Sequence, residues 1–245
     1  MIRTFLSASL GVALTLSLTA CSTDVVVDDL VDDLVDVLVA LESELAGGSS
    51  ATGDPLTADE IEAAYADLDA LPVKGRAAMT GYERDEFGHG WVDVDRNGCD
   101  TRNDVLARDL DGIDRPSGCR VLAGLLDDPY TGQLIDFVRG EGTSQLVQID
   151  HVVPLANAWA TGAQQLSEEE RVAFANDPLN LLAVDGSANQ QKGAGDAATW
   201  LPPNRGFRCE YVARQVEVKS EYRLWVTSAE RDAIERVLDG CRPAA

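Results

Sequence analysis

The chain has 245 residues, with 42 Asp or Glu against 20 Lys or Arg, so its formal charge at pH 7 is −22. This length supports one substantial hydrophobic core with appendages, and the acidic excess argues against long-range attraction to polyanions. Half of the excess lies in residues 22–60, which contain eleven acidic and no basic residues, so any phosphate binding must come from local clusters elsewhere.

The N-terminus has the composition of a secretory signal peptide. Arg3 precedes an apolar run from Phe5 to Leu18, which is shorter than the about 20 residues of a membrane span. The run ends Leu-Thr-Ala-Cys at Cys21, which resembles a bacterial lipobox. We expect a lipoprotein signal peptide over residues 1–20 and lipid on Cys21, which would anchor an exported protein on the outer face of the cell membrane. Cleavage elsewhere, which would leave the protein secreted, is the alternative.

Residues 21–53 are predicted to form an acidic, low-complexity tether and linker. Within residues 25–45, apolar residues recur at helical spacing with aspartates opposite them. A solvated stalk and a partner-binding helix both fit, and repulsion among the aspartates favours the stalk. A Gly- and Ser-rich linker follows at residues 47–53, so we expect the folded domain to occupy residues 54–245.

The domain pattern indicates an α+β fold rather than repeated βαβ units. Capping boxes at Thr57, Ser167 and Thr227 are predicted to begin three helices. Two strands, 121–126 and 134–138, are predicted on either side of a Pro- and Gly-containing turn. The other expected elements are strands over 146–149 and 179–184, a short helix from Ser187 and a long helix over 209–225.

Four cysteines remain after Cys21, and an even number in an exported chain predicts two disulfide bonds. The sequence leaves three pairings open. Loop closure and domain layout favour Cys99–Cys119 and Cys209–Cys241, each contributing about 3 kcal/mol in the chain-entropy model. A four-cysteine zinc site is the alternative, and the absence of any Cys-x-x-Cys argues against it.

Residues 75–119 are rich in Gly and Asp and show few clear periods. The segment from Asp93 to Gly98 has the opening spacing of an EF-hand calcium loop, but Asp104 stands where the motif needs Glu. A Gly-containing turn closed by the Cys99 disulfide is the favoured interpretation. A structural Ca²⁺ site stays open as the alternative.

The most informative pair is Asp150-His151, because the chain has only two histidines. Alone, the pair would be interpreted as structural, but Asn180, Asn189 and Lys192 follow it in order. A β-hairpin followed by a helix can bring Asp150 and Asn189 together with His151 beside them. Oxygen ligands of this kind suit Mg²⁺, Mn²⁺ or Ca²⁺ rather than zinc. A neutral imidazole beside a metal-bound phosphate can take a proton from water.

This ordered series resembles the His-Asn-His (HNH) nuclease motif. The chain is similar to the exported HNH proteins of actinobacteria, which are related to the C-terminal domain of GmrSD-type restriction enzymes. The resemblance covers residues 55–242 and implies an α+β fold with a ββα-metal (HNH, His-Me finger) core and additional helices and short strands. The stretches that carry it are Asp150-His151-Val152-Val153-Pro154, Asn180-Leu181-Leu182, Asn189-Gln190-Gln191-Lys192-Gly193, Cys99 to Leu106, Asp177 to Leu181 and Ala197 to Asn204.

The resemblance implies a role for each residue of the series. His151 would be the general base that activates water, and Asp150 and Asn189 would hold a single divalent metal. Asn180 would brace the loop and orient the histidine, and Lys192 would approach a phosphate or cap its helix. Because Asn189 stands where many relatives carry a second metal-binding His, we expect Mg²⁺ or Mn²⁺ rather than Zn²⁺ or Ni²⁺.

Basic residues and the second histidine receive weaker assignments. Arg102 is a candidate phosphate-binding residue, and pairing with Asp100 or Asp104 explains it equally well. Basic residues along 205–223 alternate with glutamates, which favours an ion-paired helix face over a nucleic-acid groove. His89 is expected to be a loop residue without a catalytic role.

We therefore expect a metal-dependent HNH endonuclease that hydrolyses phosphodiester bonds at the cell surface. DNA is the expected substrate, and RNA stays open. The acidic composition motivates an alternative of a different class, a catalytically inactive surface binding module that keeps the ββα-metal scaffold. A toxin-like interbacterial effector is a third hypothesis, and the lipobox argues against it.

Overall fold

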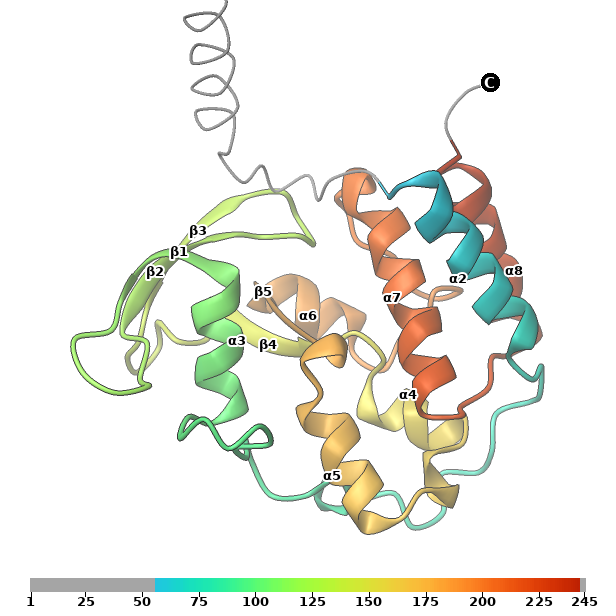
Figure 1. Ribbon diagram of the computed structural model, residues 1–245, viewed down its shortest axis with the longest axis horizontal. Coiled ribbons are helices and arrows are strands. Elements are labelled where there is room, and N and C mark those ends of the chain that lie inside the picture. Colours follow the sequence, from blue (N-terminus) through green and yellow to red (C-terminus); the bar gives the residue numbers. More distant parts are fainter. Residues whose placement is uncertain (1–55, 243–245) are drawn as a thin grey trace, which may run out of the picture. The chain divides into compact units, whose positions relative to one another are not determined.

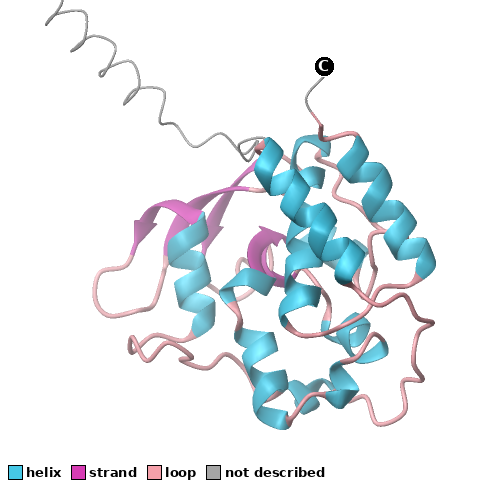
Figure 2. Cartoon of the chain, turned by 45° about the vertical axis from the view of Figure 1, so that its right-hand side comes forward, coloured by secondary structure: helices cyan, strands magenta, loops and turns pink. Residues whose placement is uncertain are grey.

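The computed structural model describes residues 56–242. The predicted signal peptide, the lipidation of Cys21 and the tether lie outside the described residues. The described chain combines helices with two small antiparallel sheets, so it is an α+β fold, as predicted (Figures 1 and 2). Within these residues, no helix is both long and apolar enough to cross a membrane.

The helices and strands are numbered as in Figure 1. The α-helices are α2 (Ala58–Ala70), α3 (Thr101–Asp109), α4 (Leu155–Ala160), α5 (Glu168–Asn176), α6 (Gly186–Lys192), α7 (Arg208–Glu221) and α8 (Ser228–Asp239). The strands are β1 (Leu110–Asp114), β2 (Ala123–Asp127), β3 (Leu134–Val138), β4 (Val147–His151) and β5 (Leu181–Asp185). Short 3-10 helices are η1 (Arg84–Phe87), η2 (Ala163–Gln165), η3 (Pro178–Asn180) and η4 (Arg205–Phe207).

Strands β4 and β5 form a two-stranded antiparallel sheet at the centre of the fold (Figure 2). Their register pairs Val147 with Asp185 and His151 with Leu181. Alternate side chains of a strand point to opposite faces, so each face joins a different core. Ile149 packs with α3 on one face, and Leu182 packs with α7 on the other.

The second sheet has the order β1-β2-β3, and all its neighbours are antiparallel. The predicted β2–β3 hairpin is present, although β2 begins at Ala123, two residues later than expected. The buried Asp128 connects this hairpin to the central sheet. One of its carboxylate oxygens accepts from the turn residue Thr131, and the other accepts from the amide of Asp185 in β5, both at 2.8 Å.

The three predicted capping boxes are confirmed at the starts of α2, α5 and α8. Helix α7, however, ends at Glu221, four residues before the expected end. Arg223 then adopts a positive φ of 54°, and Trp225 donates from its backbone to the carbonyl of Thr161 at 2.9 Å. Tertiary contacts therefore remove Trp225 from the helix despite its favourable spacing.

Helix α3 and strand β1 arise in the region 75–119, where the sequence showed few periods. Asp100 caps α3 by accepting from the amide of Asn103 at 2.9 Å. The helix buries polar Thr101 and Asn103 together with Val105. Burial of polar side chains weakens an apolar repeat, which explains why periodicity did not predict this helix.

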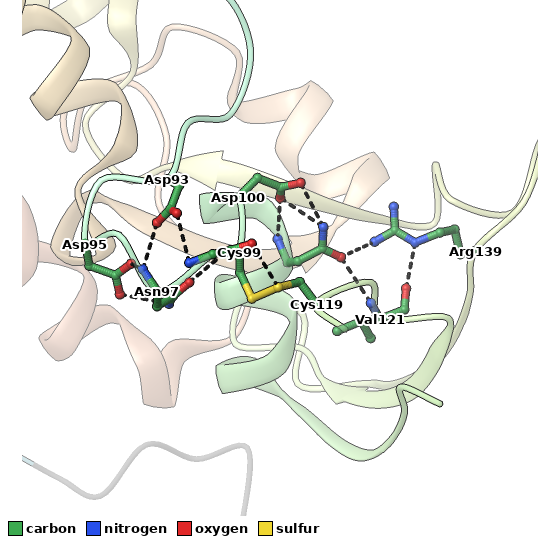
Figure 3. The surroundings of a disulfide bond; sticks show 10 residues. Asp93, Asp95, Asn97, Cys99, Asp100, Cys119, Val121 and Arg139 are labelled. Atoms are coloured by element: carbon green, nitrogen blue, oxygen red, sulfur yellow. Dashed lines mark hydrogen bonds between the residues drawn. A yellow bond between two sulfur atoms is a disulfide. The ribbon is translucent and has the colours of Figure 1, made fainter. Parts of the chain in front are cut away.

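Both expected disulfide bonds, Cys99–Cys119 and Cys209–Cys241, are present in the structure. The first joins the loop before α3 to the loop between β1 and β2 (Figure 3). In the same loop, the carboxylate of Asp93 accepts from the amides of Asn97 and Gly98, at 3.1 and 2.9 Å. These contacts form the Gly-containing turn that was favoured for this segment.

Candidate active site

Asp150 and His151 end strand β4, and their side chains point to opposite faces of the central sheet. The His151 ring contacts Trp91 and the carbonyl of Ala175, on the face that packs against α3. The Asp150 carboxylate contacts Tyr130 and Lys192, on the face that packs against α6 and α7. The pair therefore still obeys strand alternation and does not converge on one point.

Two contacts hold the imidazole ring of His151. Its Nε2 lies 2.9 Å from the carbonyl oxygen of Ala175, at the end of α5. Because a carbonyl only accepts hydrogen bonds, Nε2 carries the ring proton. The indole of Trp91 lies nearly parallel to the ring, at 12°, with 5.8 Å between the centroids. The protein thus selects one tautomer and one ring plane.

The remaining nitrogen, Nδ1, carries the lone pair of this tautomer. Burial lowers the pKa of His151 to about 4, although the Ala175 carbonyl and the Asp150 charge oppose this shift. The ring is therefore neutral at pH 7. Among the described residues, none hydrogen-bonds Nδ1. Nδ1 is also not fully buried. His151 can therefore accept a proton at Nδ1.

A cavity of about 220 Å³ lies beside His151. It is smaller than the roughly 300–1,000 Å³ of a drug-sized pocket, so it admits a single small group. Its one cationic lining side chain is Arg84, and Trp91, which stacks on the imidazole, also lines it. The lining residues are Arg84, Phe87, Gly88, Gly90, Trp91, His151, Leu155 and Ala175.

Asn180 braces the chain directly after the histidine. Its side chain is wholly buried, and its Oδ1 accepts from the amide of Val153 at 2.8 Å. Its Nδ2 donates to the carbonyls of Val153 and Phe174, both at 3.4 Å, and its own carbonyl accepts from the amide of Val152 at 2.8 Å. One amide thus ties the exit of β4 to α5, the helix that also supplies the Ala175 carbonyl.

Lys192 does not reach solvent but forms a buried ion pair with Asp150. Its Nζ lies 2.9 Å from Asp150 Oδ2 and donates to the carbonyl of His151 at 2.8 Å. Burial lowers the pKa of Lys192, and Asp150 opposes this shift. Tyr130 donates to the same carboxylate at 2.5 Å. Burial and the Asp150 charge raise the pKa of Tyr130 well above its ordinary value.

Asn189 lies one turn before Lys192 on α6 and approaches the same face of β4. Its Nδ2 donates to Oε1 of Gln148 at 3.0 Å, and no described residue donates to its Oδ1. Within residues 56–242, no three His, Cys, Asp or Glu side chains are grouped as a metal site. The oxygen donors of Asp150 and Asn189 fit Mg²⁺ or Mn²⁺ in kind, provided that Lys192 releases an oxygen of Asp150.

Arg102 and His89 do not line the cavity beside His151. Burial and the neighbouring Arg139 lower the pKa of Arg102, and Asp100 opposes this shift. His89 lies 3.5 Å from Asp85, with both side chains largely exposed. Neither residue approaches the imidazole that the sequence singled out.

The structure adds Arg84 and Trp91, which the sequence did not identify as functional. Both precede β4 by more than fifty residues, and no spacing rule connects them to Asp150-His151. The available signal was a Trp within the Gly-rich region 75–119 that showed few clear periods. A side chain as large and apolar as tryptophan in a Gly-rich loop predicts that it packs against another residue.

Comparisons with known proteins agree with the predicted relation to GmrSD-type enzymes. Residues 100–237 match the family model described as "GmrSD restriction endonucleases, C-terminal domain". A fungal protein from Arthroderma benhamiae, described as "Uncharacterized secreted protein", is 38% identical over 176 residues, which cover 71% of this chain and 82% of that protein. No solved structure matches the chain. The matched family region contains the whole Asp-His, Asn, Asn-x-x-Lys series, and Arg84 and Trp91 precede it.

Proposed function

Because this chain belongs to the family of the C-terminal domain of GmrSD restriction endonucleases, we propose that it is an exported, metal-dependent HNH endonuclease. Its substrate would be the phosphodiester bond of nucleic acid, with DNA as the first candidate and RNA as the second. In this proposal β4, β5 and α6 form the ββα-metal unit. The observation that carries the proposal is His151, which is neutral, held in one tautomer and accessible at Nδ1 beside a cavity.

In the proposed reaction, His151 acts as the general base. Nδ1 takes a proton from a water molecule in the cavity, and the water oxygen forms a bond to phosphorus. The bond from phosphorus to the leaving sugar oxygen breaks, and that oxygen takes a proton from solvent. The products are a phosphate monoester and a free hydroxyl. Ala175 and Trp91 hold the imidazole ring in place, and Asn180 holds the chain that follows the histidine.

Asp150 and Asn189 are the residues that would hold the divalent ion, with Mg²⁺ or Mn²⁺ as the expected metal. An ion held there would supply positive charge that stabilises a phosphate and its leaving oxygen. Because Asp150 and His151 point to opposite faces of the sheet, the Asp150 carboxylate would have to turn from Lys192 towards the end of β4 for this charge to reach a phosphate in the cavity. Lys192 holds Asp150 in the structure, so we propose that Lys192 positions this carboxylate rather than contacting the phosphate. Arg102 is set aside as a phosphate ligand because it does not line the cavity.

Export is supported by the description of the fungal relative as a secreted protein and by the two disulfide bonds. The lipid anchor on Cys21 remains part of the proposal, and Cys21 lies outside the described residues. A nuclease placed outside the cell would meet extracellular DNA rather than the genome of its own cell.

A second function is favoured by one observation, the ion pair that Lys192 makes with Asp150. If Lys192 never releases the carboxylate, no divalent ion binds, and the chain is an inactive surface module on the same scaffold. The net charge of −22 points in the same direction.

Incubation of supercoiled plasmid with the purified full-length chain separates the two functions. The nuclease proposal expects nicked and linear products with Mg²⁺ or Mn²⁺ and none with EDTA. Intact plasmid under every metal, together with retention of a fluorescent duplex on the protein, would instead establish the binding module. Equal cleavage in EDTA would refute the metal dependence.

A further inference from the structure

The short helix η1, with the loop that follows it, brings two side chains to His151 from outside the matched family region. Phe87 anchors η1 in the core, where its ring lies 6.2 Å from Trp159 and 5.8 Å from Phe174 between centroids. Arg171 of α5 fixes the neighbouring residue, because its Nε donates to the carbonyl of Glu86 at 2.7 Å. Arg84 therefore stands at the start of an anchored turn.

The chain then reverses over α5 and delivers Trp91 to the imidazole. Gly88 makes this turn with a φ of 89°, and a Cβ at this position would lie 2.9 Å from Cγ2 of Val172. After the turn, the amide of Val92 donates to Oδ1 of Asn176 at 3.1 Å, at the far end of α5. The loop is thus fixed at both ends, and Arg84 and Trp91 line one cavity with His151.

Among the described residues, none forms an ion pair or a hydrogen bond with the guanidinium of Arg84. The two acids that follow Arg84 lie against other residues, since Asp85 lies 3.5 Å from His89 and Glu86 lies 3.0 Å from Arg171. Arg84 is exposed, and it lines the same cavity as His151. An exposed, unpaired arginine beside a small cavity favours an anion there.

We propose that Arg84 binds the phosphate group that His151 attacks through water, in the cavity that the two residues share. The inference rests on the proposed nuclease function for the identity of the substrate, a phosphodiester. The planar guanidinium can donate two parallel hydrogen bonds to phosphate oxygens, which fixes the phosphorus relative to Nδ1. The region that matches the family model then does not contain the whole site, because the residue that binds the phosphate comes from η1.

The kinetic test compares Arg84→Gln and Arg84→Lys with a matched control, Arg205→Gln. Arg205 also begins a 3-10 helix, is exposed and has no ion pair among the described residues, but it lies outside the cavity. On a short DNA duplex with Mg²⁺, Arg84→Gln should lower kcat/KM by roughly ten- to a hundredfold, and Arg84→Lys should recover part of it. Arg205→Gln should stay within twofold of the wild type. Wild-type kinetics in Arg84→Gln would overturn the inference and leave the nuclease proposal standing.

A binding test works even without cleavage, because the chain contains only two histidines. Dimethyl phosphate titrated into the full-length chain should shift the NMR signals of the His151 ring and leave those of exposed His89 in place. Arg84→Gln should abolish the shift. If the shift depends on Arg84 but no nucleic acid is cut, the nuclease proposal fails and the anion site stands. If dimethyl phosphate leaves His151 unchanged, or shifts it equally in Arg84→Gln, the anion site is refuted.

Discussion

At the scale of single residues, the chemistry depends on which nitrogen of His151 is free. The carbonyl of Ala175 takes the proton-bearing Nε2, so the lone pair lies on Nδ1. Burial keeps the ring uncharged, although the Ala175 carbonyl and the Asp150 charge favour the protonated form. The same burial that prepares the base also makes the folded state sensitive to pH.

The pKa of His151 predicts a loss of stability at acid pH. The folded pKa is about 4, below the 6.5 of the unfolded chain, so between these values only the unfolded state binds the proton. The contribution of the neutral ring is present above pH 6.5 and is lost as pH falls towards 4. It amounts to at most about 3 kcal/mol.

Urea unfolding at pH 7.5 and 4.5, in EDTA, measures this term. The wild type should lose more unfolding free energy than His151→Gln between the two values, and His89→Gln should behave like the wild type because His89 is exposed. All other groups titrate alike in the three proteins, so their contributions to the pH dependence cancel when the proteins are compared. An identical pH dependence in wild type and His151→Gln would contradict the burial argument.

Positions in the motif were easier to infer from the sequence than the contacts that each candidate residue makes. Asn180 could be assigned a bracing role because its place in the motif is defined, and its amide does hold Val153. The ion pair of Lys192 with Asp150 could not be predicted, since the motif gives spacing and not the direction of a long side chain. Arg84 was missed because it comes close to His151 only through the packing of η1 on α5.

At the scale of elements, α6 decides what Asp150 can bind. Asn189 and Lys192, one turn apart, both face β4, where Asn189 donates to Gln148 and Lys192 pairs with the Asp150 carboxylate. The single negative charge of Asp150 cannot neutralise both a metal ion and the Lys192 ammonium. Removal of the ammonium should therefore increase metal binding.

Lys192→Met tests this competition against Lys219→Met. Each change breaks a buried ion pair, of Lys192 with Asp150 at 2.9 Å or of Lys219 with Glu230 at 2.7 Å, and should cost about 3–5 kcal/mol. In thermal melts, Mn²⁺ should raise the Tm of Lys192→Met more than that of the wild type, because the ion replaces the lost cation. Lys219→Met should show no such gain. Equal Mn²⁺ responses in the two variants would place the metal away from Asp150.

Element boundaries were predictable where local chemistry sets them. The capping boxes at Thr57, Ser167 and Thr227 each begin a helix because the cap satisfies backbone amides whatever the tertiary context. The end of α7 was not predictable, because Trp225 leaves the helix for contacts with residues far away in the sequence. Strand β4 likewise continues through Asp150 and His151, since its pairing with β5 extends to Leu181.

At the scale of the whole molecule, the acidic charge is the main argument against a nuclease. Residues 56–242 hold 33 acidic and 19 basic residues, so the described domain is less acidic than the full chain but still strongly negative. Eight of the basic residues form ion pairs, and two of these, Lys192 and Lys219, are buried. Substrate binding must therefore depend on a few local cations, of which Arg84 is the one beside His151.

The most direct test of the account is the rate of plasmid cleavage by the full-length wild type, His151→Ala and His89→Ala under the same Mg²⁺ or Mn²⁺ conditions. The two variants remove the only histidines of the chain, one buried beside the cavity and one exposed. Loss of a general base lowers a rate by roughly 10²–10⁴-fold, so His151→Ala should lose at least a hundredfold and His89→Ala almost nothing. A folded His151→Ala that cuts plasmid within threefold of the wild-type rate would contradict the assignment of His151 and, with it, the proposed mechanism.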